Sequence, residues 1–139
     1  MNLEAEEEVY AFHEEQFFVP ASLQKIPLSV TAFSVLGNDF CFQTTLAYEG
    51  IIDEEGVLHG NLLVQGGGDP TLPLTIFDEW EACLKNHGVH SIEGKIIVDT
   101  SVFETAMASP FWYFEDLGNY FGAGACGLSI NKNSYKITF

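Results

Sequence analysis

The run Gly66-Gly67-Gly68-Asp69-Pro70 constrains the fold more than any other segment of this chain. Three glycines and a proline disfavour both helix and strand, so we expect a loop here that divides the sequence. Before this loop, Phe40–Tyr48 and Val57–Gln65 have the composition of strands. The polar run Asp53-Glu54-Glu55-Gly56 lies between them and predicts a turn.

The sequence after the loop predicts a helix followed by further strands. Phe77–Asn86 is amphipathic, with its apolar residues at helical spacing, and Gly88 follows its end. Ile92–Val98 predicts a strand, and Leu128–Ile130 with Tyr135–Phe139 predicts a final strand pair. Strands and helices are therefore both expected in this part of the chain.

The amino-terminal part predicts a hairpin and one helix. The aromatic runs Val9–Phe12 and Gln16–Val19 flank a polar turn, which favours two short strands. A helix is expected to begin near Ser22 and to end at Gly37, with Pro27 distorting it locally. Its apolar residues at helical spacing are Leu23, Ile26, Val30 and Phe33.

These elements together predict an α+β fold with a domain boundary in the range 38–44, where the helix ends and strand-rich sequence begins. We place the two parts at residues 1–43 and 44–139. The chain ends within the predicted strand that contains Ile137 and Thr138, which would leave an unpaired strand edge. We take this ending as a sign of truncation.

The charge balance is strongly acidic. The chain has 20 Asp and Glu against 5 Lys and no Arg, for a net charge of -15. Such a surface repels phosphate backbones and anionic lipids, so neither nucleic acid nor a membrane surface is an expected partner. The sequence contains no apolar run long enough to span a bilayer and no secretory signal.

Other residues with potential chemistry favour structural roles. Cys41, Cys83 and Cys126 fit neither a zinc pattern nor a redox motif, so buried structural thiols are expected. The Gly66–Gly68 run could hold an anion, but no Lys-Ser/Thr pair follows it. His87 and His90 have a metal-like spacing, but a solvated loop is the expected setting. No cofactor or metal is therefore expected.

The tetrad Ser22-Leu23-Gln24-Lys25 is the segment that indicates chemistry. Residues i and i+3 share one face of a helix, so the Lys25 amine can reach the Ser22 hydroxyl. A serine becomes a strong nucleophile when a neighbouring base takes its proton, and a desolvated neutral lysine can serve as that base. Ser-x-x-Lys is a motif of penicillin-binding proteins and serine β-lactamases. The structural alternative is a helix-capping serine followed by an exposed lysine.

The order of several sequence blocks resembles the peptidase S13 family, the low-molecular-mass class C penicillin-binding proteins of the D-Ala-D-Ala carboxypeptidase/endopeptidase type. The resemblance covers about residues 17–139 and keeps the order and approximate spacing of the family's blocks. The blocks are Phe18–Lys25, Leu36–Phe40, Thr44–Leu46, Gly56–Leu62, Gly68–Leu72, Ile92–Ile96, Val98–Phe103, Trp112 with Asp116 and Tyr120, and Leu128–Asn133.

This resemblance implies a serine-type D-Ala-D-Ala carboxypeptidase that acts through an acyl-enzyme. Ser22 matches the acylated nucleophile and Lys25 its base, with peptidoglycan stem peptides as substrates and β-lactams as trapping ligands. Residues 1–43 match part of a transpeptidase-like α/β domain, and residues 44–139 match the start of a strand-rich inserted domain. The implied location is periplasmic or otherwise extracytoplasmic.

The family's remaining catalytic motifs are not matched in this chain. Lys-Thr-Gly is absent from the sequence, and Ser129-Ile130-Asn131 satisfies Ser-x-Asn only as a pattern, because it aligns with the inserted domain. Without Lys-Thr-Gly the substrate carboxylate lacks its binding strand, and one donor of the oxyanion hole is missing. We therefore expect an amino-terminal fragment that is inactive by itself.

Two alternatives remain at this point. Pro20–Pro27 also resembles the class D β-lactamases and β-lactam sensor domains, although the later blocks, such as Gly68-Asp69-Pro70, do not. The second alternative is a non-catalytic module that binds the cell wall or has only a structural role.

Overall fold

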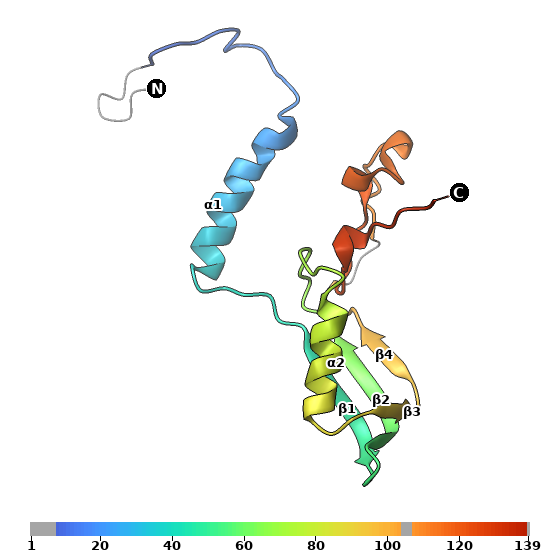
Figure 1. The fold of residues 1–139 in the computed structure, drawn as a ribbon. Coiled ribbons are helices and arrows are strands. Elements are labelled where there is room, and N and C mark those ends of the chain that lie inside the picture. Colours follow the sequence, from blue (N-terminus) through green and yellow to red (C-terminus); the bar gives the residue numbers. More distant parts are fainter. Residues whose placement is uncertain (1–7, 104–106, 139) are drawn as a thin grey trace. The chain divides into compact units, whose positions relative to one another are not determined.

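The computed structural model describes residues 8–103 and 107–138. The chain forms two compact units, Met1–Phe40 and Cys41–Phe139, and each is described by itself (Figure 1).

The regular structure of the first unit, within its described residues 8–40, is one long helical segment. A 3-10 helix, η1 (Ala21–Gln24), continues directly into the α-helix α1 (Lys25–Leu36). Gly37 ends α1 with a positive φ of 79°, a conformation that glycine adopts without steric cost. Both ends of the predicted helix are therefore confirmed. The irregularity that the structure shows near Pro27 is a change from 3-10 to α geometry at Lys25, two residues earlier.

The predicted hairpin of Val9–Phe12 and Gln16–Val19 is wrong. Residues 8–20 contain no strand; a turn in which Gln16 N–H donates to the His13 carbonyl occupies the middle of the segment. A two-stranded hairpin is only marginally stable unless a helix or a third strand packs on it. The aromatic side chains here are exposed, Phe17 completely, so nothing in the described structure supports such a hairpin.

The surface of α1 is apolar and exposed on all sides. None of its residues is buried, and Ile26, Val30 and Phe33 are each more than 60% exposed. Helices that are apolar all round normally lie in the interior of a larger domain.

The second unit is built on a four-stranded sheet whose central strand is β2. Strand β1 (Thr45–Ile52) pairs antiparallel with β2 (Val57–Gln65). The turn between them is closed by Gly56 N–H, which donates to the Asp53 carbonyl. The predicted turn and the bounds of β2 are confirmed, whereas β1 begins five residues later than predicted and extends to Ile52.

A helix connects β2 to the far side of the sheet. Helix α2 (Ile76–Asn86) follows the glycine-rich loop, and β3 (Ser91–Glu93) and β4 (Ile96–Asp99) then pair in parallel with β2. The predicted helix is confirmed. The predicted single strand Ile92–Val98 is two strands, because Gly94 passes close to the Gly60 backbone and Lys95 N–H donates to the Asn61 side chain.

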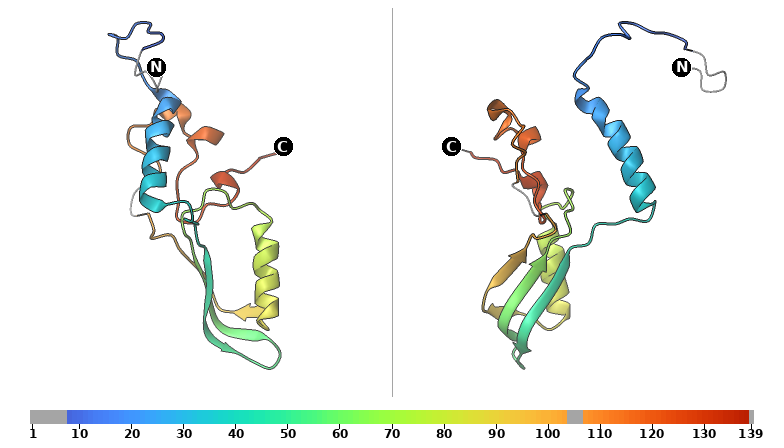
Figure 2. Two further views of the ribbon diagram at one scale, coloured as in Figure 1. Left: turned by 90° about the vertical axis from the view of Figure 1, so that its left-hand side faces the viewer. Right: turned by 180° about the vertical axis from the view of Figure 1, so that it is seen from behind.

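Helix α2 covers one face of the sheet, as the views in Figure 2 show. The buried apolar side chains of the described residues are Leu58, Leu62, Val64 and Val89. The first three are in β2, and their even-numbered positions point to one side of the strand. The core therefore lies between β2 and α2, and β1 and β4 flank it.

The carboxy-terminal part contains three short 3-10 helices, η2 (Phe114–Asp116), η3 (Tyr120–Gly122) and η4 (Asn131–Asn133). The predicted final strand pair is wrong. Ile130 forms an isolated bridge with Leu72, residues 135–138 are not in a strand, and Phe139 lies outside the described residues. Asn131, Lys132 and Asn133 all have positive φ, which turns the chain away before a strand could continue.

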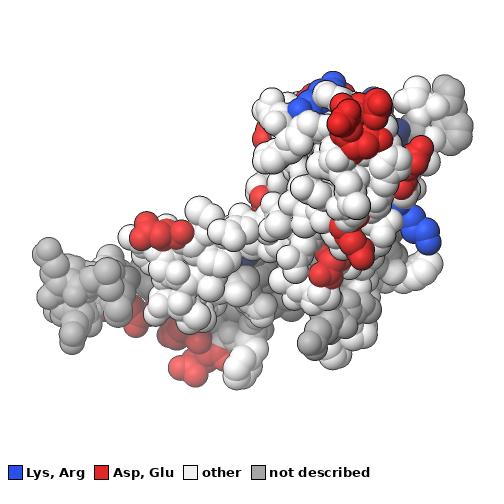
Figure 3. Space-filling model, turned by 90° about the horizontal axis from the view of Figure 1, so that it is seen from below, with Lys and Arg blue, Asp and Glu red and all other residues white. Residues whose placement is uncertain are grey.

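The α+β fold class is confirmed by this sheet and the two helices. No described helix combines the length and apolar character needed to cross a membrane. On the face drawn in Figure 3, Asp and Glu side chains form several separate groups among fewer Lys side chains.

Candidate active site

Ser22 and Lys25 lie within one turn at the start of the helical segment. Ser22 is the second residue of η1, and Lys25 is the first residue of α1. The Lys25 N–H donates to the Ser22 carbonyl, which is the i to i+3 bond of a 3-10 turn. Side chains three residues apart eclipse one another in this geometry, so Ser22 and Lys25 occupy the same face.

The backbone immediately before Ser22 is in an unusual conformation. Ala21 has a φ of +45°, in the left-handed region that residues with a Cβ rarely adopt. Such a residue costs on the order of 1–3 kcal/mol, and residues of this kind cluster at functional sites. His13 and Asn131–Asn133 share a positive φ elsewhere in this chain, so the conformation of Ala21 alone does not mark a site. The strained residue thus sets the direction in which the chain enters the Ser22 turn.

Both side chains of the predicted pair are exposed. No hydrogen bond joins Ser22 Oγ to Lys25 Nζ, although both residues are described. The described surroundings therefore place the two groups on one face but leave them in solvent. The catalytic roles of Ser22 and Lys25 stay predictions.

The Ser129-Ile130-Asn131 pattern has a structural role in the second unit. Ser129 is buried, and its hydroxyl donates to the Cys126 carbonyl at 3.1 Å. The Asn133 side chain donates to Ser129 Oγ at 3.0 Å and to the Gly124 carbonyl at 2.7 Å. These bonds hold the turn around η4 together. They give Ser129 and Asn133 a structural role that does not involve catalysis.

The glycine run is a crossing point of the backbone. A Cβ at Gly66 would collide with Gly127, and a Cβ at Gly67 would collide with the backbone of Gln43. Gly68 N–H donates to the Gly127 carbonyl at 2.7 Å. Close chain packing thus explains why glycine stands here.

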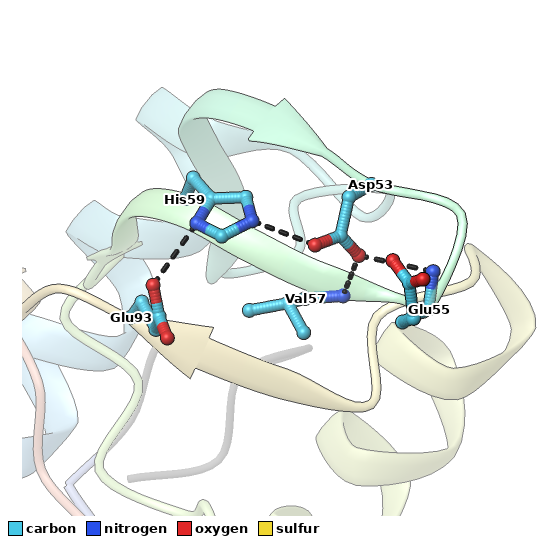
Figure 4. A network of polar contacts seen from close by, with 5 residues as sticks. All are labelled: Asp53, Glu55, Val57, His59 and Glu93. Atoms are coloured by element: carbon cyan, nitrogen blue, oxygen red, sulfur yellow. Dashed lines mark hydrogen bonds and ion pairs between the residues drawn. The ribbon is translucent and has the colours of Figure 1, made fainter.

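A polar network joins the β1–β2 turn to β3 (Figure 4). His59 Nε2 lies 2.6 Å from Asp53 Oδ2, and His59 Nδ1 lies 3.0 Å from Glu93 Oε2. The other oxygen of Asp53 accepts hydrogen bonds from the N–H groups of Val57 and Glu55. One imidazole therefore bridges two carboxylates from different elements.

The charges in this network shift two pKa values. The Val57 N–H, and next to it His59, lower the pKa of Asp53 below its ordinary value. The hydrogen bond to Asp53 is the main cause that raises the pKa of His59, and Glu93 adds to it. The network thus favours the doubly protonated imidazolium between two carboxylates.

The other residues with potential chemistry have local partners or lie in solvent. The ring nitrogen Nδ1 of His87 donates to the Cys83 carbonyl at 2.8 Å, which caps the end of α2. Cys41 and Cys83 are exposed and Cys126 is half-buried, and all three are unpaired. The expectation of buried thiols is therefore wrong. Cys83 lines an open pocket of about 240 Å³ together with Leu46 and Leu62, so packing between α2 and the sheet does not close over its thiol.

The second unit also contains a pocket of about 620 Å³. Three aromatic residues, Phe42, Phe103 and Tyr120, contribute to its walls, together with Ser129 and Lys132. All of its lining residues belong to Cys41–Phe139, so it does not include Ser22 or Lys25.

Sequence reasoning missed the His59 network. The turn composition predicts that Asp53 lies near the start of β2, and this signal places it close to His59. The contribution of Glu93 depends on the parallel pairing His59↔Glu93 between β2 and β3. That register is fixed by tertiary structure and leaves no local pattern in the sequence.

Comparison with known proteins identifies the family. The sequence profile of the D-Ala-D-Ala carboxypeptidase 3 (S13) family matches residues 1–139. The D-alanyl-D-alanine carboxypeptidase DacB of Haemophilus influenzae is 31% identical over 134 residues, which are 96% of this chain and 28% of that protein. A D-alanyl-D-alanine carboxypeptidase of Actinomadura sp. (strain R39) is 30% identical over 124 residues, 89% of this chain and 23% of that protein.

Solved structures agree with this assignment. The crystal structure of penicillin binding protein 4 (dacB) from Haemophilus influenzae superposes with a TM-score of 0.81 at 34% identity, covering 90% of this chain and 27% of that one. The same protein complexed with a β-lactam gives a TM-score of 0.61 at 39% identity, covering 73% of this chain and 23% of that one.

The chain belongs to the D-Ala-D-Ala carboxypeptidase 3 (S13) family, as the sequence blocks predicted. It spans about a quarter of the length of the curated relatives that it matches.

Proposed function

We propose that this chain provides the nucleophile and base of a serine-type D-Ala-D-Ala carboxypeptidase/endopeptidase of peptidoglycan maturation. One observation carries the proposal: the 3-10 turn that opens the helical segment puts Ser22 and Lys25 on one face, in a chain of the S13 family. The proposed partners are peptidoglycan stem peptides and β-lactams, and the proposed location is extracytoplasmic.

The proposed reaction proceeds through an acyl-enzyme. Ser22 Oγ attacks the carbonyl carbon between the two D-alanines while a neutral Lys25 amine takes the hydroxyl proton. The bond to the terminal D-Ala nitrogen then breaks, and that nitrogen takes the proton from Lys25 and leaves as the free amine. Water attacks the ester carbonyl and releases the shortened peptide, which restores the Ser22 hydroxyl. A β-lactam acylates the same oxygen by opening its ring.

The surface of α1 supports a role within a larger catalytic domain. A base of this kind has to be desolvated, yet Lys25 is exposed and the apolar side chains that follow it are uncovered. We propose that residues 1–43 form part of a transpeptidase-like domain and that residues 44–139 form part of an inserted domain. The division of the chain into compact units after Phe40 supports a boundary in this region. The chain contains no Lys-Thr-Gly sequence, so the carboxylate site of the substrate has to come from other polypeptide.

A chimera tests the proposed nucleophile. This chain replaces the matching segment of the Haemophilus influenzae relative, and the product is incubated with a fluorescent penicillin. We expect covalent labelling that mass spectrometry assigns to Ser22 and that Ser22→Ala abolishes. Ser34→Ala removes another exposed hydroxyl of the same helix and should leave labelling unchanged. Labelling that survives Ser22→Ala in the folded chimera would contradict the proposal.

The isolated chain gives a second measurement. Without a desolvated lysine or a Lys-Thr-Gly strand, it should acquire little label under conditions that saturate the chimera. Stoichiometric acylation of the isolated chain at Ser22 would refute the inference that other polypeptide completes the site.

A further inference from the structure

Strand β4 has an uncovered outer edge. It pairs with β2 on one side, and in the part of the chain that the structure describes no strand pairs with its other side. The two ribbon views place β4 at the border of the sheet (Figures 1 and 2). Its apolar residues are exposed, Ile96 by 65%, Ile97 by 39% and Val98 by 49%. An exposed apolar edge of this kind is a template for pairing with another strand.

The hydrogen bonds to β2 show which groups face outward. Leu62 N–H donates to the Lys95 carbonyl, and Gly66 N–H donates to the Asp99 carbonyl. Alternate residues of a strand direct their N–H and C=O groups to opposite edges, so Lys95, Ile97 and Asp99 face β2. The backbone groups of Ile96 and Val98 therefore face the open edge.

The sequence of this strand is complementary to itself. In an antiparallel pair of two copies centred on Ile97, Ile96 of each copy lies opposite Val98 of the other. Both residues present outward N–H and C=O groups, so they form hydrogen-bonded pairs, and Ile97 lies opposite itself in a pair without hydrogen bonds. The outward-facing hydrogen-bonding groups are thus compatible with a two-fold register centred on Ile97.

Charge complementarity favours this same register. The segment Lys95-Ile96-Ile97-Val98-Asp99 carries a cation at its start and an anion at its end. The two-fold arrangement puts Lys95 of each copy opposite Asp99 of the other, and opposite charges across a strand pair are stabilising. The Lys95 side chain is exposed and forms no ion pair with the described residues, so it is available for this contact.

The other edge of the sheet is less suitable. Strand β1 contains Glu49 and Gly50 at its middle, and Gly50 has a positive φ of 131°. A charged residue and a distorted glycine both reduce pairing at an edge strand. The pairing surface is therefore β4.

We propose that two copies of this chain associate through antiparallel pairing of β4 with β4, with Ile97 at the two-fold axis and reciprocal Lys95–Asp99 ion pairs. The sheets of both copies then continue into one another, and the two α2 helices lie on the same face. The pairing covers only one short strand from each copy, so the dimer is weak and depends on concentration. This inference does not depend on the proposed activity.

Charge exchange at the two ends of β4 tests the register. Sedimentation equilibrium of the full chain is measured up to about 1 mM protein at about 0.15 M salt, where the repulsion between two acidic chains is screened. Lys95→Glu should weaken the wild-type self-association about tenfold, because it puts two carboxylates opposite each other at both ends. Lys132→Glu changes the net charge by the same amount away from β4 and should leave the association unchanged.

A mixture of two variants separates this register from other modes of association. Asp99→Lys alone also places like charges opposite each other, but a mixture of Lys95→Glu and Asp99→Lys chains restores both ion pairs in the heterodimer. We expect the mixture to associate at least as strongly as the wild type. Association through the exposed α1 helix would be insensitive to all of these changes.

A cross-link provides a second readout. Ile97→Cys, in a chain whose Cys41, Cys83 and Cys126 are replaced by Ser, should form a disulfide between the introduced thiols of the two copies on mild oxidation, since opposed residues without hydrogen bonds lie within disulfide range. Ile51→Cys on β1, in the same background, should cross-link much less. A monomeric wild type, a Lys95→Glu variant that associates normally, or equal cross-linking at both positions would each overturn the proposal.

Discussion

His59 holds the turn after β1 to the end of β3, with its Nε2 atom 2.6 Å from Asp53 Oδ2. Its second nitrogen contacts Glu93 at 3.0 Å, so a single ring connects segments that lie 40 residues apart in the chain (93 minus 53). Both contacts gain strength when the imidazole is protonated, because both partners are carboxylates.

This contact predicts a pH-dependent stability. The pKa of His59 is raised above 6.5, so its contribution is complete below that pH and is lost as the pH rises through the raised value. The pKa of Asp53 is lowered below 3.8, so its contribution is present above that pH and is lost as the pH falls through the lowered value. The wild type should exceed His59→Gln in melting temperature most clearly at about pH 5 and least at about pH 9.

Thermal unfolding followed by circular dichroism measures this difference. The effect should amount to a few degrees at most, because the side chains are largely exposed and solvent screens the pair. His13→Gln removes a histidine from the first unit and serves as the control. A constant offset between wild type and His59→Gln at all pH values would show that the ring contributes only packing.

Leu58 is the residue on which the core of the second unit most depends. It is the one described side chain with no exposed surface at all, and it lies on the α2 side of the central strand. Leu58→Ala should lower the free energy of unfolding by about 2–5 kcal/mol, through lost apolar contact and the cavity that remains. Urea unfolding gives the value. Ile51→Ala, which truncates a side chain that is 75% exposed, should change it by less than about 0.5 kcal/mol.

Gly67 distinguishes steric crowding from backbone strain. A Cβ there would collide with the backbone of Gln43, so Gly67→Ala forces two chain segments apart and should cost about 1–3 kcal/mol. Gly88→Ala meets no neighbouring atom but has to adopt a φ of 79°, which costs about 1 kcal/mol. Urea unfolding should rank Gly67→Ala as the more harmful change. The reverse order would mean that the crossing at Gln43 relaxes easily.

The proposed base predicts a specific effect of Lys25→Arg. Arginine keeps the positive charge but does not release its proton near neutral pH, so it does not accept the Ser22 proton. In the chimera, the acylation rate should fall by about 10²–10⁴-fold, in the range of general base catalysis. Stopped-flow measurement with a chromogenic β-lactam tests this, with Lys85→Arg on α2 as the matched control. A rate reduced by less than about threefold would assign the base to another group.

Much of the second unit could be predicted because its signals are local. The turn residues Asp53–Gly56 and the glycine run fix both ends of β2, and the helix signals of Phe77–Asn86 lie within the helix itself. The division of Ile92–Val98 into two strands could not be predicted in this way. It depends on Gly94 meeting the Gly60 backbone, a contact between residues 34 positions apart (94 minus 60).

The wrong predictions have a common physical cause. Gln16–Val19 and Tyr135–Phe139 have strand-forming composition, but a strand needs a partner strand. In the described structure neither segment has such a partner.

Of the candidate functional residues, only those that lie close together in the sequence could be predicted. The spacing of Ser22 and Lys25 is a property of one turn, whereas the carboxylates around His59 come together through sheet register.

The central position of β2 has a consequence for the order of folding. It is the one described strand that contacts all three others, and its pairing with β1 closes across a short turn. Its pairing with β3 has to wait for the whole α2 connection to close, which costs more chain entropy. The β1–β2 ladder should therefore gain hydrogen-exchange protection first during refolding, and the amides of β2 should be the last to exchange in the native protein.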